Sequence, residues 1–207
     1  MPSALSGLME LAEAPVQGPS PSFDRARFLL AFLAIGASGS IGRGALAKSA
    51  GLGEGAVRTV LKRLRESGYA RVDASGCHLT ASGTAAYRTL RHALSDPLRL
   101  DGSHLTIGNA QTALAVRGAG SLVKKGLEQR DSAVMAGAEG ATTYVVKGGK
   151  FTIPGGSSDC ESDFPSPAWT TLRDRLKPRD DDAIVLCGAS DETKAILGAL
   201  SAALTLI

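Results

Sequence analysis

The stretch GAVRTVLKRLRESGYARVDASGCHLTASG, residues 55–83, decides the fold of the first half of the chain. It places four basic side chains within eight residues, from Arg58 to Arg65, and two short β-rich runs follow. A charge run of this kind is either a solvated helix face or a surface that meets a negatively charged partner. The spacing of the apolar residues between the charges helps to separate the two interpretations.

Apolar periodicity predicts a helix over residues 54–67 that stops at Gly68, because glycine readily takes the left-handed conformation that ends helices. The predicted core face of this helix is formed by Val57, Val60, Leu61 and Leu64. Arg58, Lys62 and Arg65 share a narrow arc beside that face, whereas Arg63 points away from the arc. We therefore expect Arg63 to be ordinary solubility charge and the other three cations to form one surface.

Two helices are predicted upstream of this segment. The first begins after Ser22, which is a suitable N-cap, and stops at Gly36. The second spans about residues 43–49 and leads into a turn at Gly51 and Leu52. Together with the helix at 54–67, they form a three-helix arrangement with a short turn before the third helix.

A hairpin and a fourth helix are predicted downstream. Two short alternating strands flank residues 73–76, and Thr80 is a suitable cap for a helix that must end before Pro97. The order of three helices, a hairpin and a further helix is typical of a winged helix-turn-helix domain. We place this domain at residues 21–96, after an N-terminal arm at 1–20 that is expected to be flexible because it ends in Pro, Ser and Gly.

The segment IGRGALAKSAGLGEGAVRTVLKRLRESGYARV, followed by LTASG, resembles the winged-helix domain of prokaryotic transcription regulators. Its form GR-x-x-LA, followed by G-x-GEG-x-VR, is similar to an archaeal family of two-domain proteins. In that family a winged helix precedes a small α+β domain of unassigned function. The segment GLEQRDSAVMAGAEGATT, residues 126–143, resembles the second domain of the same family.

This resemblance and the basic arc together predict an interface with double-stranded DNA. The helix at 54–67 would enter the major groove and the wing at 69–80 would contact the backbone, while cations of the helix at 43–49 position the domain. The expected contacts are Arg43, Lys48, Gly55, Arg58, Thr59, Lys62, Arg65, Arg71, Ser75 and His78. The alternative is a solvated face on a winged helix that serves as a protein-interaction module.

The distribution of charge along the chain supports the first interpretation. The chain has 207 residues and a net charge of +3, yet residues 21–100 hold 12 Lys and Arg against 5 Asp and Glu. Residues 101–207 hold 11 basic against 13 acidic residues. Only the first half therefore has the charge expected of a polyanion-binding surface.

Several classes of protein are not indicated. The odd number of cysteines, at 77, 160 and 187, suggests neither a disulfide framework nor a zinc site, so we expect a cytoplasmic protein. No apolar run reaches the ~18 residues of a membrane span. The acidic clusters at 159–163 and 180–182 lack calcium-loop spacing and are expected to be solvated loops. No catalytic motif is evident, so we expect no enzymatic activity, no metal and no cofactor.

The second half is predicted as a linker at 97–111, with room for one short strand, and an α+β domain at 112–207. Strands are expected near 112–118 and 183–188, a hairpin around Gly148 and Gly149, and helices after Ala168 and after Ser190, the expected cap. This order favours one sheet covered on one face by helices, a ferredoxin-like or related α+β sandwich.

Candidate ligand or dimer contacts in this domain are Glu128, Gln129, Arg130, Asp131, Gly118 and Gly120. Arg130 has the chemistry to bind a carboxylate or phosphate, but a structural ion pair explains it as well. Gly118 and Gly120 begin a dinucleotide fingerprint that lacks its third glycine, and a tight turn explains them equally.

We therefore expect a DNA-binding transcription regulator that acts as a homodimer, with the second domain for dimerisation or for sensing a small-molecule effector. The alternatives are a small-molecule-binding protein or enzyme with an autoregulatory winged helix, and a winged-helix protein-interaction module.

Overall fold

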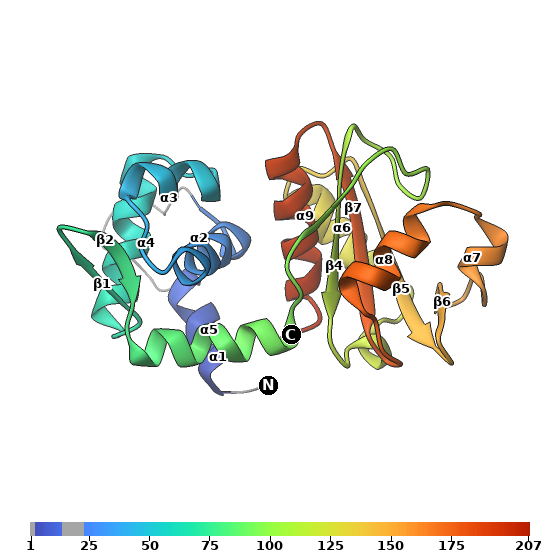
Figure 1. Cartoon of the computed structure of the whole chain (residues 1–207), viewed down its shortest axis with the longest axis horizontal. Coiled ribbons are helices and arrows are strands. Elements are labelled where there is room, and N and C mark those ends of the chain that lie inside the picture. The colour runs from blue at the N-terminus through green and yellow to red at the C-terminus, as the bar shows by residue number, and fades with distance from the viewer. Residues whose placement is uncertain (1–2, 14–22) are drawn as a thin grey trace. The chain divides into compact units, whose positions relative to one another are not determined.

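The computed structural model of the chain describes residues 3–13 and 23–207. The chain divides into two compact units, Met1–Arg91 and His92–Ile207, and each is described by itself (Figure 1). The first unit is mostly helical and the second is built on a five-stranded sheet. The protein is thus a mixed α and β protein with a helical first part and a sheet-based second part.

The first unit has the predicted order of three helices, a hairpin and a helix, preceded by one further helix. The elements are α1 (Ser3–Glu13), α2 (Arg25–Ser38), α3 (Arg43–Ala50), α4 (Glu54–Glu66), β1 (Ala70–Asp73), β2 (Gly76–Leu79) and α5 (Ala81–Ala93). Thr80 accepts a hydrogen bond from Gly83 N at 3.0 Å, which confirms it as the cap of α5. The predicted core face of α4 is buried at all four positions.

Helix α1 corrects the expectation for the N-terminus. The prediction of a flexible arm is wrong at residues 3–13, because they form a helix that buries Leu8, Met9 and Ala12. The amphipathic spacing of these three residues was the available signal, because it places them on one face. The rest of the predicted arm, like the predicted cap Ser22, lies outside the described residues.

Helix α2 runs past its predicted stop at Gly36. A Cβ at Gly36 would lie 2.3 Å from the Tyr87 ring, so this glycine allows close packing against α5 rather than ending the helix. The helix ends at Gly39, which has a φ of +67°. Its N-cap is Asp24, whose side chain accepts a hydrogen bond from Arg27 N.

The second unit contains one antiparallel sheet and five helical segments among its described residues. Its strands are β3 (Leu98–Leu100), β4 (Ala110–Val116), β5 (Gly140–Lys147), β6 (Lys150–Thr152) and β7 (Ala183–Ala189). Its helices are η1 (Gly120–Leu122), α6 (Leu127–Met135), α7 (Cys160–Asp163), α8 (Ala168–Leu176) and α9 (Glu192–Leu204). The segment 97–111, predicted as a linker with one short strand, contains β3 and also the first residues of β4.

The strand order is β3-β4-β7-β5-β6, with every pair antiparallel. Because β4 and β5 both run antiparallel to β7, they run in the same direction, joined by α6 and separated by β7. This is the split βαβ arrangement of ferredoxin-like folds. The chain adds β6, α7 and α8 between β5 and β7.

Helices cover both faces of this sheet, so the prediction of a single covered face is wrong (Figure 1). Trp169, Leu172 and Leu176 of α8 pack in one cluster with Ile184 and Leu186 of β7. On the opposite face the Cys187 sulfur lies against α9, 3.6 Å from the point where a Cβ at Gly198 would stand. Strand β7 is buried at every position, a pattern that indicates cover on both faces.

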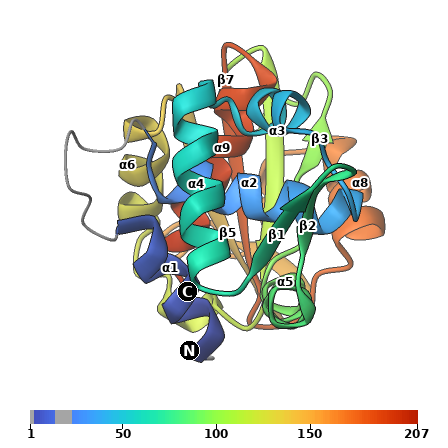
Figure 2. The ribbon, with the colours of Figure 1, turned by 90° about the vertical axis from the view of Figure 1, so that its left-hand side faces the viewer.

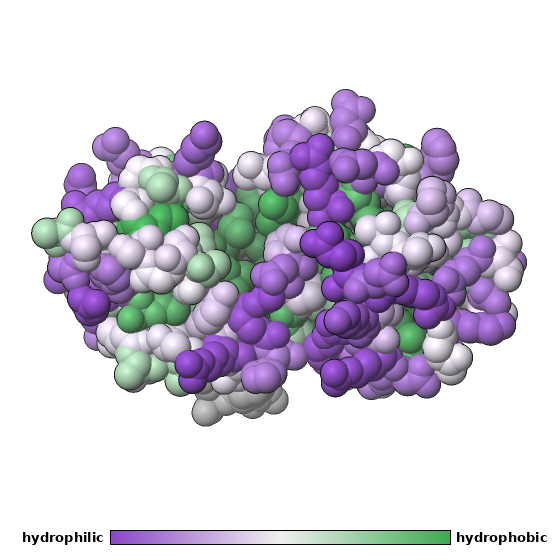
Figure 3. All heavy atoms as spheres, viewed as in Figure 1, coloured by the Kyte–Doolittle hydropathy of each residue, from purple (hydrophilic) through white to green (hydrophobic). Residues whose placement is uncertain are grey.

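Polar residues cap the start of α9 and cover the outward face of α8. Asp191, rather than the predicted Ser190, caps α9, because its side chain accepts a hydrogen bond from Lys194 N at 2.9 Å. Hydrophilic residues cover the outward face of α8, as the space-filling view shows (Figure 3). The sheet therefore lies between two helical layers, and the exposed residues of α8 and of the first turn of α9 are polar.

Candidate nucleic-acid interface

Helices α3 and α4 and strand β1 frame a hollow of about 500 Å³ in the first unit. Figure 2 looks onto this side of the unit and shows α4 in front, with α3 near one end and the β1–β2 hairpin beside it. The hollow is lined by Arg43, Gly44, Glu54, Val57, Arg58, Leu61, Lys62, Arg65 and Val72. The structure thus brings together four cations that were predicted to contact DNA.

The four cations surround the apolar side chains of Val57 and Leu61, which line the base of the hollow. Val57 and Leu61 belong to the buried face of α4, and the basic side chains beside them are exposed because the next helical positions turn toward solvent. This is the arc predicted from the periodicity of residues 54–67. The local sequence folds in this way because the apolar residues must face the core.

Most of this positive charge is not neutralised by neighbours. Among the residues that the structure describes, no ion pair joins Arg43, Arg58 or Arg65 to a carboxylate. Lys62 approaches Glu66 only to 3.9 Å, and both side chains are exposed, so this pair contributes little. With four cations and the one carboxylate of Glu54 in its lining, the hollow keeps a net positive charge suited to a polyanion.

The first turn of α4 is open to close approach. A Cβ at Gly55 would meet nothing within 4 Å, so the backbone there is bare. The hydroxyl of Thr59 donates to the Gly55 carbonyl at 3.1 Å, which directs it along the helix. The N-cap Gly53 supplies no side-chain hydrogen bond, so the backbone N–H groups at this end have no side-chain cap.

Two other predicted cations lie apart from this hollow. Arg71 lines a neighbouring hollow of about 560 Å³, which Lys62 and Arg65 also line, and it is paired with Asp73. Lys48 is exposed on α3 but does not line either hollow. The basic surface thus continues from α4 toward the hairpin, with Lys48 outside it.

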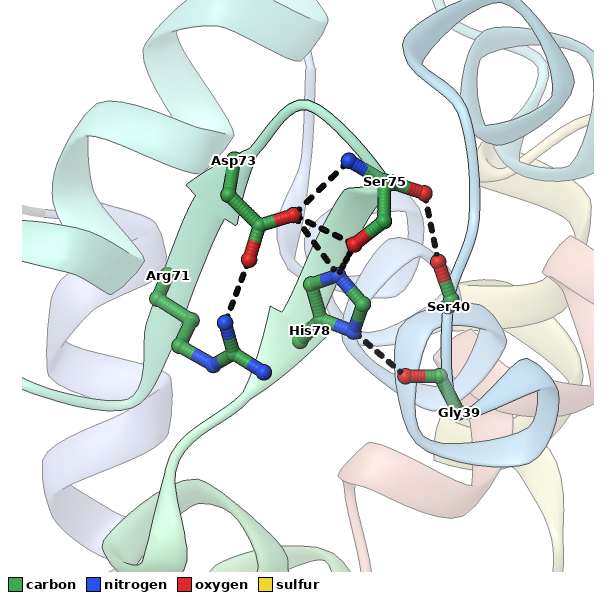
Figure 4. A network of polar contacts seen from close by, with 6 residues as sticks. All are labelled: Gly39, Ser40, Arg71, Asp73, Ser75 and His78. Atoms are coloured by element: carbon green, nitrogen blue, oxygen red, sulfur yellow. Dashed lines mark hydrogen bonds and ion pairs between the residues drawn. The ribbon is translucent and has the colours of Figure 1, made fainter.

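The hairpin is held by a polar network (Figure 4). Asp73 accepts hydrogen bonds from Ser75 N at 2.9 Å, from the Ser75 hydroxyl and from Arg71. The Ser75 donors, followed by the nearby His78, lower the pKa of Asp73 to about 2. Ser40 donates its hydroxyl hydrogen to the Ser75 carbonyl at 2.8 Å, which ties the hairpin tip to the segment before α3.

His78 is part of the same network. Its Nδ1 lies 3.0 Å from the Gly39 carbonyl and therefore carries the proton, because a carbonyl only accepts. Its Nε2 lies 2.9 Å from the Ser75 hydroxyl and 3.2 Å from Asp73. The side chain is only 13% exposed. Of the predicted DNA contacts, Ser75 and His78 are thus engaged in shaping the hairpin.

The expectation for Arg63 is wrong. Arg63 is buried, at 7% exposure, and its Nη1 donates to the carbonyls of Leu11 at 2.9 Å and Ala12 at 2.8 Å. Its guanidinium also lies over the Phe23 ring, 5.3 Å from the centroid. It therefore satisfies carbonyls at the end of α1 that lack helical partners. No local pattern signals this contact, because the partners are some fifty positions away.

The candidate residues of the second unit occupy separate structural roles. Gln129 is buried and donates to the Thr205 hydroxyl at 2.6 Å. Glu128, Arg130 and Asp131 are exposed, and Arg130 approaches Asp131 only to 3.9 Å. The polar run predicted as one site thus points partly into the unit and partly to solvent.

The two glycines that resembled a dinucleotide fingerprint form a tight turn. Gly118 N donates to the Asp182 carboxylate at 3.0 Å, and Gly120 N donates to the Asp181 carbonyl at 2.7 Å. Asp182 is 2% exposed and pairs with Arg117 at 2.7 Å. The prediction that 180–182 is wholly solvated is therefore wrong at Asp182, which holds the end of β4.

Nothing in the described part of the chain assembles three or more potential metal-ligating side chains. None of the helices in that part combines the length and the apolar character that a membrane span requires. The three cysteines are buried, and burial raises the pKa of Cys187 to about 12, so its thiol is protonated at neutral pH.

Comparisons with known proteins found a family model and a solved structure that are similar to this chain. Residues 107–206 match the family model described as a domain of unknown function, DUF4443. The solved structure of hypothetical protein PH0730 from Pyrococcus horikoshii OT3 is similar, with a TM-score of 0.69 and 24% identity over 89% of this chain and 93% of that one. No curated protein matches. At 24% identity, the similarity to PH0730 shows the fold alone.

Proposed function

We propose that this protein is a DNA-binding transcription regulator whose first unit is a winged helix-turn-helix domain. Helices α3 and α4 form the helix-turn-helix and the β1–β2 hairpin forms the wing. The observation that carries the proposal is the convergence of Arg43, Arg58, Lys62 and Arg65 on one hollow. Exposed cations in this number favour a polyanionic partner over a solvated surface.

We assign these residues to different parts of the DNA according to their positions on the helices and the hairpin. Helix α4 enters the major groove, where the bare backbone at Gly55 allows a close approach. Arg58, on the second turn, reaches base edges, while Lys62 and Arg65 contact phosphates. Arg43 and Lys48 add backbone contacts from α3, and Arg71 contacts the neighbouring backbone from the wing.

The proposal is tested by titrating the protein with a fluorescent duplex of mixed sequence at several salt concentrations. Each released counterion contributes to the slope of log K against log salt. Lys62→Ala should weaken binding several-fold and reduce the slope by about one unit. Arg88→Ala, which removes an exposed cation on α5 outside the hollow, is the matched control and should leave both values unchanged.

Three results would refute the proposal. One is the absence of salt-dependent binding by the parent protein. The second is equal loss of binding in Lys62→Ala and Arg88→Ala, which would indicate a diffuse charge effect. The third is tight binding that neither Arg58→Ala nor Lys62→Ala alters.

A further inference from the structure

Helix α6 carries an apolar stripe on its outward face. Leu127 and Val134, seven residues apart, are 56% and 44% exposed, and Met135 beside them is 83% exposed. The opposite face of the helix carries Gln129 and Ala133, both buried against the rest of the unit. Large apolar side chains gathered on one exposed face mark an interaction surface.

Two opposite charges flank the seam formed by Leu127 and Val134, one on each side, and Met135 lies beyond the second of them, about 80° from Leu127. With roughly 100° between successive residues, Leu127 and Val134 fall within about 20° of each other. On the same wheel Arg130 lies about 60° to one side of Leu127 and Asp131 about 40° to the other. Both side chains are exposed and are 3.9 Å apart at their closest charged atoms. The seam therefore has a positive edge and a negative edge.

We infer that this face binds a second copy of the chain, with the two α6 helices parallel and related by a two-fold axis that runs along them. Such an axis places Leu127 against the partner's Leu127 and Val134 against the partner's Val134. It also turns the positive edge of each copy toward the negative edge of the other. Arg130 of each copy therefore faces Asp131 of the other copy, which gives two equivalent contacts. The surface is then complementary to itself.

The charge pattern selects this arrangement over the antiparallel one. In an antiparallel pair, the two-fold axis is perpendicular to the helices and keeps each edge on its own side. Arg130 would then face the partner's Arg130, and Asp131 the partner's Asp131, which is unfavourable. Oppositely charged residues beside an apolar seam set partner and orientation in the same way in coiled coils.

The strength of this contact is limited by the length of the helix. Nine residues span about 13 Å at 1.5 Å per residue, so the contact is smaller than a standard stable interface. We expect a dimer with a Kd on the order of micromolar. This inference depends on α6 alone and does not require that the protein bind DNA.

Charge exchange tests the inference in the full chain by sedimentation velocity across micromolar concentrations. Arg130→Glu and Asp131→Arg, each alone, place like charges across the seam and should give monomers. An equimolar mixture of the two variants restores opposite charges on both edges and should give a dimer. The double variant Arg130→Glu/Asp131→Arg should also self-associate as the parent does.

Because both side chains are exposed, all variants should keep the parent's thermal melting temperature when the samples are melted well below the expected Kd, where dimerisation adds no stability to the parent. This measurement separates loss of the contact from loss of folding. A parent that is monomeric throughout this range would overturn the inference. So would single variants that dimerise as the parent does, or a mixture of the two that stays monomeric.

Cysteine cross-linking tests the parallel register. Val134→Cys and Leu127→Cys should each form a disulfide with its own counterpart under mild oxidation, and the three native cysteines are buried. Lys147→Cys, at an exposed position on β5, is the control and should not cross-link. Cross-linking only in a mixture of the Leu127→Cys and Val134→Cys proteins would show an antiparallel pair and overturn the proposed geometry.

Discussion

At the scale of single residues, Arg63 shows how the same residue type serves two purposes in one helix. Arg58, Lys62 and Arg65 face solvent around the hollow, whereas Arg63 lies between α4 and the end of α1. Its guanidinium spans two carbonyls and an aromatic ring, so it links the N-terminal helix to α4. A charge count over residues 58–65 treats all four cations alike, although only three are available to a partner.

Arg63→Ala should therefore destabilise the protein. The substitution leaves the carbonyls of Leu11 and Ala12 without their donor, and unsatisfied buried groups cost about 1–3 kcal/mol. The free energy of unfolding, measured by urea titration, should fall by that amount, whereas Arg88→Ala should change it by less than about 0.5 kcal/mol. An equal effect of the two substitutions would contradict the role assigned to Arg63.

Arg58 is expected to determine sequence preference. Its position on the second turn of α4, one turn from the bare Gly55, places it where recognition helices reach base edges. A guanidinium pairs with both acceptors of guanine, which is worth about 1–3 kcal/mol of discrimination. Selection from random DNA should therefore enrich a site with a guanine at one position, and Arg58→Ala should lose that preference while keeping the rest of the site. Retention of the guanine by the variant would assign it to another residue.

At the scale of elements, the β1–β2 hairpin depends on a polar network as well as on strand pairing. Asp73, Ser75 and His78 join the hairpin tip to the segment before α3, and Ile41 exchanges backbone hydrogen bonds with Cys77 at 2.8 and 3.1 Å. The hairpin is thus attached to the segment that leads into α3. This attachment allows the network to set the position of Arg71.

Ser75→Ala should raise the pKa of Asp73 toward its ordinary value of 3.8, because the Ser75 side chain is the largest cause of its lowering. NMR titration of the carboxyl group would measure the change. In the parent the folded-state pKa is lowered, so the network stabilises the hairpin above pH 3.8 and loses that contribution as the pH falls toward 2. An unchanged pKa in the variant would show that other donors hold the carboxylate.

Elements were predictable from the sequence where the signal was local. The α4 helix, the hairpin and the Thr80 cap follow from periodicity and turn residues within a few positions. The second helical layer over the sheet and the burial of Arg63 and Asp182 depend on contacts between distant segments, which one sequence does not display. Strand β7 carried the one local signal of the second helical layer, because its unbroken apolar run indicates that helices cover both of its faces.

At the scale of the whole molecule, dimerisation and DNA binding are expected to reinforce each other. A two-fold dimer presents two copies of α4, so its site should be an inverted repeat with half-sites related by the same symmetry. The second contact then occurs within one complex, and the effective concentration of the second domain raises affinity without new contacts. The proposed α6 seam is short, so DNA would also stabilise the dimer.

The substitution Leu127→Asp separates the contribution of dimerisation to DNA affinity from the contribution of the direct DNA contacts. It places a charge in the α6 seam, far in sequence from the basic residues of the first unit, and should weaken binding to a full inverted repeat by about 10²-fold or more. Binding to an isolated half-site should be unchanged, because α4 and the β1–β2 hairpin are intact. Both affinities are measured by anisotropy at one fixed salt concentration. Equal losses on the two sites would mean that Leu127 supports the fold, and no loss on either would mean that a different surface of the chain holds the two copies together.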